Sequence, residues 1–184
     1  TDKIGIGAGL IYATGGFGLK KGVPVQDTMG NYGDATLEGK ASGMGFNAGV
    51  YLKPNEKWSF GMDYRSSVKV SVDGGTASFN VPASLEEYFP TTTFAAEITM
   101  PHVLSFGAGF SPNEKLKIAL DVNQVGWHVY DTLAFDFADT TAKLQNIRAP
   151  RMYKDAFIVR AGVQYHLKEN LFVRCGAYYD ISPV

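Results

Sequence analysis

The chain has 184 residues, a formal net charge of -1 at pH 7 and a pI near 6.3. This near-neutral charge excludes the broad basic surface that nucleic acids require, so no nucleic-acid partner is expected. A transmembrane helix is also excluded, because no run of about 18 apolar residues occurs. The single cysteine, Cys175, permits neither an intrachain disulfide nor a cysteine-based metal site.

Seven stretches of the chain have the composition and alternation of β-strands. They cover residues 3–14, 41–53, 58–73, 97–111, 115–130, 155–167 and 171–180. Strands of soluble sheets are usually about 5–6 residues long, whereas these stretches have roughly the length that a tilted strand needs to cross a bilayer. The sequence therefore predicts an all-β, antiparallel transmembrane β-barrel in contact with a lipid bilayer.

The alternation is clearest over residues 58–73. Apart from Ser66, one face carries only apolar side chains, which are Trp58, Phe60, Met62, Tyr64, Val68, Val70 and Val72. The other face carries small or polar residues, which are Ser59, Gly61, Asp63, Arg65, Ser67, Lys69, Ser71 and Asp73. Because successive side chains of a strand point to opposite sides of the sheet, we expect one continuous strand with a lipid-facing and a lumen-facing side.

The connections between these stretches are alternately short and long. The short ones, residues 53–57, 111–115 and 167–170, contain the Pro, Asn and Glu typical of tight turns. The long ones cover residues 15–40, 74–96 and 131–154. Short periplasmic turns and long extracellular loops are characteristic of outer-membrane barrels.

A soluble β-sandwich would also alternate, and it is the main structural alternative. Strand length and loop asymmetry argue against it. The apolar faces also begin or end with aromatic residues, namely Tyr12, Trp58, Phe110, Tyr165 and Tyr179. Aromatic girdles of this kind mark the two interfaces of a membrane barrel.

The last strands resemble a known family. The segments that carry the resemblance are Tyr153-Lys154-Asp155-Ala156-Phe157, Ala161-Gly162-Val163-Gln164-Tyr165, Asn170-Leu171-Phe172-Val173-Arg174 and residues 176–184, with Tyr64-Arg65-Ser66-Ser67 and Met100-Pro101 earlier in the chain. They are similar to the FadL family of outer-membrane transporters, over nearly the whole chain.

This resemblance implies a fourteen-stranded barrel plugged by an N-terminal hatch, in the bacterial outer membrane. It also implies a hydrophobic small molecule, either a long-chain fatty acid or an aromatic hydrocarbon, as the transported partner. Residues 1–184 are then expected to form a partial barrel domain with seven of the fourteen strands. An open half-barrel would expose unpaired strand edges in lipid, so the hatch and the remaining strands are expected to complete it.

Polar side chains on the lumenal face are the first candidate site. They are Asp63, Arg65, Lys69, Asp73, Lys117, Asp121, Arg160, Arg174 and Asp180. A cross-strand network of salt bridges is the structural interpretation. The functional one is that an unpaired cation, Arg65 or Arg160, binds a ligand carboxylate inside the barrel.

The long connection 74–96 holds the second candidate. Ser84 and Glu87 form a helix-start pattern, and the short helix that follows would carry Leu85, Tyr88 and Phe89 on one face, with Phe94 further on. Exposed apolar residues on an extracellular loop require burial or a ligand. We expect either a packed lid or a landing groove for a hydrophobic ligand. Leu133, Phe135 and Phe137 in the next connection resemble an extension of a strand.

Signals for an enzyme are weak, and no cofactor is expected. His102, His128 and His166 lie on different predicted strands without metal-ligand spacing, and no Gly-x-Ser-x-Gly motif occurs. The leading hypothesis is uptake of hydrophobic molecules through a loop groove and a lumenal pocket. The alternatives are a barrel scaffold for secretion or surface-protein assembly, a polar-solute porin and a soluble lipid-binding β-protein.

Overall fold

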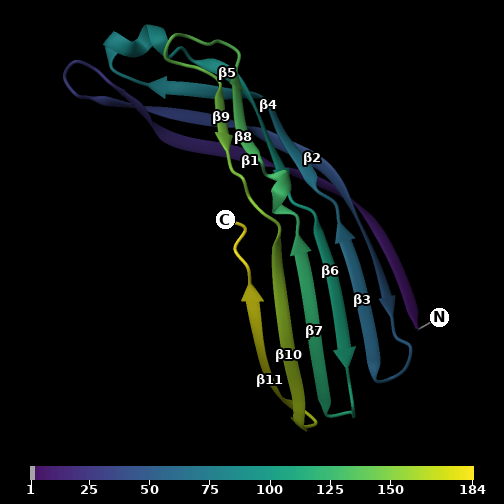
Figure 1. Ribbon diagram of the computed structural model, residues 1–184. Coiled ribbons are helices and arrows are strands. Elements are labelled where there is room, and N and C mark those ends of the chain that lie inside the picture. Colours follow the sequence, from purple (N-terminus) through teal and green to yellow (C-terminus); the bar gives the residue numbers. More distant parts are fainter. Residues whose placement is uncertain (1–2) are drawn as a thin grey trace.

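The computed structural model describes residues 3–184, apart from the side chain of Pro24. These residues form one antiparallel sheet and two short 3₁₀ helices (Figure 1). The strands are β1 (Ile4–Gln26), β2 (Tyr32–Leu52), β3 (Trp58–Arg65), β4 (Val68–Asn80), β5 (Thr92–Met100), β6 (Val103–Phe110), β7 (Leu116–Val125), β8 (Thr132–Phe137), β9 (Ile147–Pro150), β10 (Ala156–Lys168) and β11 (Leu171–Asp180). The helices are η1 (Ala83–Tyr88) and η2 (Trp127–Val129). Neither helix has the length and apolar composition to cross a membrane.

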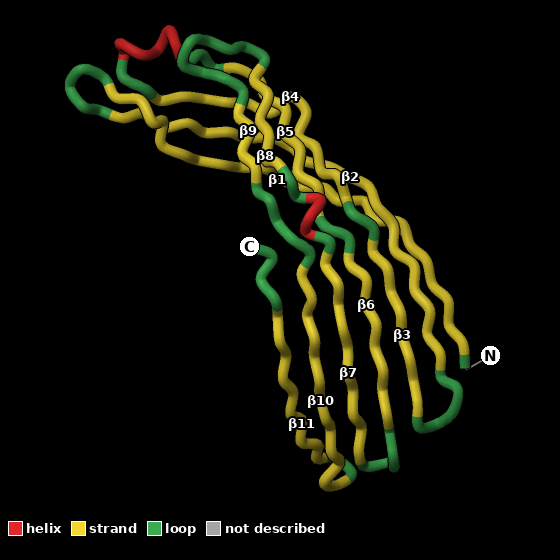
Figure 2. Tube along the Cα trace, in the orientation of Figure 1, coloured by secondary structure: helices red, strands yellow, loops and turns green. Residues whose placement is uncertain are grey.

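The strands of the sheet follow seven paths. The order in the lower part of Figure 1 is β1-β2-β3-β6-β7-β10-β11, and in the upper part it is β1-β2-β4-β5-β8-β9. Four paths are therefore interrupted, because β3 continues into β4, β5 into β6, β7 into β8 and β9 into β10 (Figure 2). The prediction of seven long antiparallel strands is confirmed. The sheet is open in the described chain, with β1 and β11 at the edges of its lower part.

The predicted long loops are wrong in extent, because strands occupy much of them. β1 and β2 continue through the connection 15–40 and leave only residues 27–31 as a turn. In that turn, the Asp27 side chain accepts hydrogen bonds from the backbone N–H groups of Met29 (2.8 Å) and Asn31 (2.9 Å). The connections 74–96 and 131–154 likewise contain β4, β5, β8 and β9. The upper part of the sheet thus extends the barrel wall on the extracellular side.

The short periplasmic turns are confirmed, and two of them share one geometry. The Asn55 side-chain oxygen accepts hydrogen bonds from the backbone N–H groups of Lys57 and Trp58, both at 2.9 Å. Asn113 repeats this pattern with Lys115 and Leu116, both at 3.0 Å. The repeated Pro-Asn-Glu-Lys sequence is therefore a repeated Asn-centred turn, which sets the register of the hairpins on either side.

An apolar belt covers one face of the lower sheet. A single cross-strand row shows how complete it is, since it runs through Ile6, Val50, Met62, Phe106, Val122, Val159 and Tyr179. All but one of these side chains are at least 38% exposed. On β10 the belt extends from Phe157 to Leu167, about 33 Å at ~3.3 Å per residue, which a tilt of about 40° reduces to the ~25 Å of an outer-membrane belt.

The apolar face changes sides where β3 gives way to β4. Two residues lie between Met44 and Asn47 on β2, whereas three lie between their partners Lys69 and Arg65. One extra residue in one strand of a pair forms a β-bulge, and a shift of one residue moves every later side chain to the other face. Val68, Val70 and Val72 therefore face inward, and the prediction that they share a face with Trp58 is wrong.

The same inversion corrects the predicted lumenal charges. Lys69 and Asp73 lie on the outer face of the upper sheet, where Lys69 pairs with Glu97 of β5 at 2.6 Å. Below the break the apolar residues face lipid and small or polar residues face inward. Above it, apolar residues face inward and charges face water. Each half of the wall thus presents its apolar side to an apolar environment.

Candidate functional site

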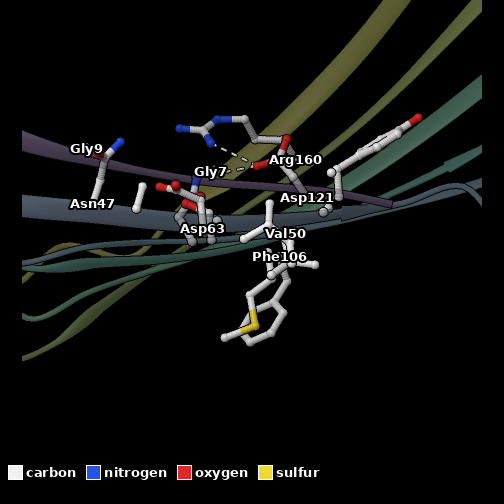
Figure 3. A pocket seen from close by; sticks show the side chains of 18 residues that line it. Gly7, Gly9, Asn47, Val50, Asp63, Phe106, Asp121 and Arg160 are labelled. Carbon is white, nitrogen blue, oxygen red and sulfur yellow. Dashed lines mark hydrogen bonds and ion pairs between the residues drawn. The ribbon is translucent and has the colours of Figure 1, made fainter. Parts of the chain in front are cut away.

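The inward face of the lower sheet carries a broad hollow, here called the concave groove. It has a volume of about 820 Å³ and is lined by residues from β1, β2, β3, β6, β7 and β10. Its floor consists largely of glycines, namely Gly5, Gly7, Gly9, Gly49, Gly61 and Gly107. Figure 3 shows Asp63, Asp121 and Arg160 on the groove side of the sheet and Phe106 on the opposite, lipid-facing side.

Packing within the sheet does not require glycine at two positions of this floor. A Cβ added at Gly7 or Gly61 would meet no atom within 4 Å. Backbone entropy makes glycine unfavourable in a strand interior, so both residues cost stability without relieving a contact in the described chain. Their effect is to keep the groove deep.

One ion pair lies at one side of the groove. Arg160 on β10 and Asp121 on β7 are register partners, and Arg160 Nη1 lies 2.9 Å from Asp121 Oδ1. Arg160 is therefore on the groove wall as predicted, but it is paired, and the interpretation that it is an unpaired cation is wrong. Asp63 makes no ion pair within residues 3–184.

Arg65 lies on the same face near the upper end of β3, opposite Asn47 and Val103. It does not line the concave groove. In the part of the chain that the structure describes, its side chain makes no ion pair or hydrogen bond. The structure therefore places the two predicted arginines on one face, but only Arg65 keeps its charge without a partner there.

Sequence reasoning missed a cluster at the periplasmic end of the same face. Arg174 Nε donates a hydrogen bond to Gln164 Oε1 at 2.6 Å, and Gln164 Nε2 lies 3.1 Å from His166 Nε2. The His166 ring packs edge-on against Phe172, with centroids 4.4 Å apart. The alternation of side chains along the strand placed Arg174 on the lumenal side. Its contacts with β10 depend on the register between the two strands, which the sequence does not reveal.

The second predicted site, on the extracellular connections, is a packed core. Leu85, Phe89 and Phe94 are 5%, 6% and 2% exposed, and Tyr88 is partly buried beside them. The core also contains Val23, Leu37, Val72, Ala77, Ala96, Phe135, Phe137 and Leu144. We call this cluster the lid core. It brings the four predicted residues together, but three of them are buried, so these side chains form no open landing groove within residues 3–184.

Two details of that prediction are resolved. The short helix is confirmed as η1, but Ser84 does not cap it, because the N-cap is Pro82 and no side chain makes a capping hydrogen bond. The expected strand extension at Leu133, Phe135 and Phe137 is confirmed as β8, which pairs with β5.

A third cluster lies at the strand breaks above the apolar belt. His128 Nδ1 lies 2.6 Å from Asp155 Oδ1, and this hydrogen bond holds the pKa of the Asp155 carboxyl below its usual range. The rings of His102 and His128 are 5.8 Å apart, whereas His166 lies elsewhere on the sheet. Among the described residues, no group of three or more His, Cys, Asp or Glu side chains has the arrangement of a metal site.

An antiparallel wall with a complete outer apolar belt, a polar concave face and periplasmic turns defines an outer-membrane β-barrel. The family model of the outer membrane protein transport proteins (OMPP1/FadL/TodX) matches residues 1–184, and the chain belongs to this family. The predicted outer-membrane location and family resemblance are thereby confirmed.

Curated relatives match the chain at low sequence identity. The chain is 24% identical to the long-chain fatty acid transport protein of Salmonella typhi over 159 residues, which is 82% of this chain and 36% of the relative. It is 26% identical to outer membrane protein P1 of Haemophilus influenzae over 163 residues, 88% of this chain and 33% of the relative. These relatives are named as transport or outer-membrane proteins, and the chain spans about a third of their length.

Solved structures share the fold. A Pseudomonas aeruginosa FadL homologue superposes with a TM-score of 0.76 at 16% identity, covering 100% of this chain and 47% of that one. The Ralstonia pickettii toluene transporter TbuX gives 0.71 at 18% identity, covering 98% and 52%. At these identities the likeness establishes the fold alone.

Proposed function

We propose that this chain forms part of the wall of an outer-membrane channel for the uptake of hydrophobic small molecules, either long-chain fatty acids or aromatic hydrocarbons. Membership of the transport family supports the class of function. Relatives named as fatty acid and toluene transporters support the two ligand classes. The role is non-catalytic. Strands and a plug outside this chain would close the wall into a barrel, because open strand edges are unstable in lipid.

The concave groove is the observation that carries the proposal. Its glycine floor exposes backbone and Cα atoms over about 820 Å³, within the range of small-molecule sites. Two of its three charged side chains, Asp121 and Arg160, pair with one another at one side, and the third, Asp63, has no ion-pair partner among residues 3–184. An apolar ligand chain can lie over the glycine floor, and each buried methylene would contribute roughly 0.8 kcal/mol.

The extracellular part would act as a lid above this groove. Ligand contact at Leu85, Tyr88, Phe89 and Phe94 stays a prediction, and it requires the lid core to open, because three of these side chains are buried. Arg65, which has no ion-pair partner among residues 3–184, is the better placed of the two predicted arginines for a ligand carboxylate.

Uptake into proteoliposomes tests the proposal. Full-length protein reconstituted in bilayers should accelerate entry of radiolabelled oleate or toluene over protein-free vesicles, with little ion conductance. Substituting the groove floor at Gly7 and Gly61 with Leu should slow entry, whereas Phe106→Leu on the lipid-facing side should not. Large, steady ion conductance without selectivity for hydrophobic solutes would indicate a porin instead. Absence of uptake together with a stoichiometric protein partner would indicate a scaffold.

A further inference from the structure

The periplasmic end of the concave face carries two cations on one cross-strand row. Lys117 of β7 is the register partner of Gln164 on β10, and Gln164 is the partner of Arg174 on β11. With strands about 4.8 Å apart, the two Cα atoms flank Gln164 at a separation of about 10 Å. Both side chains are long enough for their charges to converge on one group between them.

Neither cation has an acidic partner in the described chain. No ion pair within residues 3–184 involves Lys117 or Arg174. The nearest carboxylate along β7 on this face, Asp121, is already held by Arg160. This arrangement differs from the middle of the groove, where opposite charges are paired across the same two strands.

The Arg174 guanidinium is oriented by a chain of contacts. Its Nε donates to Gln164 Oε1, so the amide nitrogen of Gln164 donates to His166 Nε2, which Phe172 supports from the side. The guanidinium also lies over the Phe172 ring, with Cζ 5.8 Å from the ring centroid. These contacts leave Nη1 and Nη2 without a hydrogen-bond or ion-pair partner in the described residues. The pair of N–H groups that remains matches the two oxygens of a carboxylate.

A hollow of about 300 Å³ lies at these side chains. It is lined by Lys117, Ala119, Gly162, Gln164 and Arg174, together with parts of Val163 and Cys175. Ala119 and Gly162 form its uncharged floor. They are register partners, and their row lies between the row of Lys117 and Gln164 and the row of Asp121 and Arg160, so the floor leads toward the concave groove. The hollow thus combines two cations with a small-residue floor suited to an attached apolar chain.

We propose that Lys117 and Arg174 bind the carboxylate of an amphipathic ligand at the periplasmic end of the lumenal wall, with the ligand's apolar chain lying over Ala119 and Gly162. The proposal rests on the uptake function proposed above and names the ligand class for this position. A fatty acid, ionised at neutral pH, fits both parts of the hollow. An uncharged hydrocarbon gains nothing from the two cations.

Binding to full-length protein in detergent tests this site, with oleate and methyl oleate as the two probes. Lys117→Gln and Arg174→Gln should each weaken oleate binding by about tenfold, as expected for loss of a charge-assisted bond, and leave methyl oleate unchanged. Gln164→Leu, which removes the support of Arg174, should weaken oleate binding in the same direction and keeps the test valid if Arg174→Gln does not fold. Lys115→Gln, which removes an exposed charge in the adjacent turn, is the matched control.

An unchanged ratio of oleate to methyl oleate affinity in the Lys117 and Arg174 variants would overturn the proposal. A lowered unfolding temperature of the ligand-free variants alongside that unchanged ratio would show that the two cations stabilise the fold instead. Failure of the unsubstituted protein to bind either probe would instead contradict the uptake function.

Discussion

Tyr64 and Val68 are four residues apart on one strand path, yet their side chains lie on opposite sides of the sheet. Tyr64 is the register partner of Ala48 and Leu104, which face outward. Val68 instead packs over the backbone of Gly43 and Gly45 on the inner side. The residues between them supply the extra position of a β-bulge. This bulge marks the level at which the wall leaves the lipid and encloses its own apolar core.

Deleting Ser67 should abolish the inversion. The deletion removes the extra residue, so Val68, Val70 and Val72 would face water and Lys69 would face the lid core. We expect the upper sheet to become susceptible to external protease, while the apolar belt still inserts. Ser67→Ala keeps the residue count and is the matched control. Equal protease resistance in the deletion and the control would contradict the assignment of the bulge.

Ser66 stabilises the bulge between β3 and β4 through two hydrogen bonds to the backbone of Phe46. Its Oγ accepts a hydrogen bond from the Phe46 N–H, and its own N–H donates to the Phe46 carbonyl, both at 2.9 Å. Ser66→Ala leaves the Phe46 N–H without this acceptor, and we expect a loss of about 1 kcal/mol in the free energy of unfolding. Ser67→Ala again serves as control. Urea unfolding of the refolded protein in detergent measures both, and equal stabilities would rule out this role for Ser66.

Phe94 should matter far more to stability than a phenylalanine of the apolar belt. It is 2% exposed and contacts Phe17 and Phe135 with ring centroids 5.9 and 6.0 Å away. Phe94→Ala should cost about 3–5 kcal/mol through lost packing and a cavity. Phe106→Ala, on a lipid-facing side chain that is 48% exposed, should cost much less. Similar losses for the two variants in thermal unfolding would argue against a closed lid core.

Asp27 should make the extracellular turn 27–31 sensitive to acid. Hydrogen bonds, first of all from the Asn31 side chain, lower the pKa of Asp27 below its usual 3.8. Since the folded pKa is depressed, the carboxylate stabilises the turn above the usual pKa and this contribution is lost as pH falls through the folded value. The amide proton shifts of Met29 and Asn31 should titrate with a midpoint below 3.8 in NMR of the full-length protein.

Asp27→Ala provides the comparison for that titration. Without the carboxylate, neither amide should show the transition. A midpoint at or above the usual aspartate value in the unsubstituted protein would contradict the hydrogen-bonded turn.

Asp121→Asn should release Arg160 for a ligand. Both side chains are more than 40% exposed, so screening keeps the stability change below about 1 kcal/mol. The freed guanidinium should strengthen oleate binding by up to about tenfold without affecting toluene. Asn123→Ala, which alters the neighbouring groove residue without a charge change, is the control. Weaker oleate binding in Asp121→Asn would show that the ion pair itself is part of the binding surface.

The lower wall was predictable from the sequence because one rule, alternation with period two, governs both of its faces. The upper wall was not. In residues 58–73 only Ser66 interrupts the alternation, and one polar residue on an apolar face does not by itself reveal the extra residue of a bulge. In residues 15–40 the glycines weaken the strand signal, and pairing between β1 and β2 supplies what local preference lacks.

For the candidate site, the sequence predicted the face on which a residue lies but not its partners. The alternation of side chains placed Arg65 and Arg160 on the lumenal side, which the structure confirms. Whether a cation is paired depends on the register between strands distant in sequence, as with Asp121 and Arg160. The contacts of Arg174 with Gln164 and His166 depend on that register too. Burial of Leu85 and Phe94 required the curvature of the whole upper sheet.

Site-directed spin labelling along residues 58–72 tests the inverted wall most directly. Single cysteines in full-length protein in bilayers, with Cys175→Ala as background, would be probed with molecular oxygen and a water-soluble nickel complex. We expect oxygen accessibility to peak at positions 60, 62 and 64. Positions 68, 70 and 72 should be protected from both reagents, and positions 69 and 71 should be accessible to the nickel complex. One unbroken alternation, with positions 70 and 72 as accessible to oxygen as 60 and 62, would contradict it.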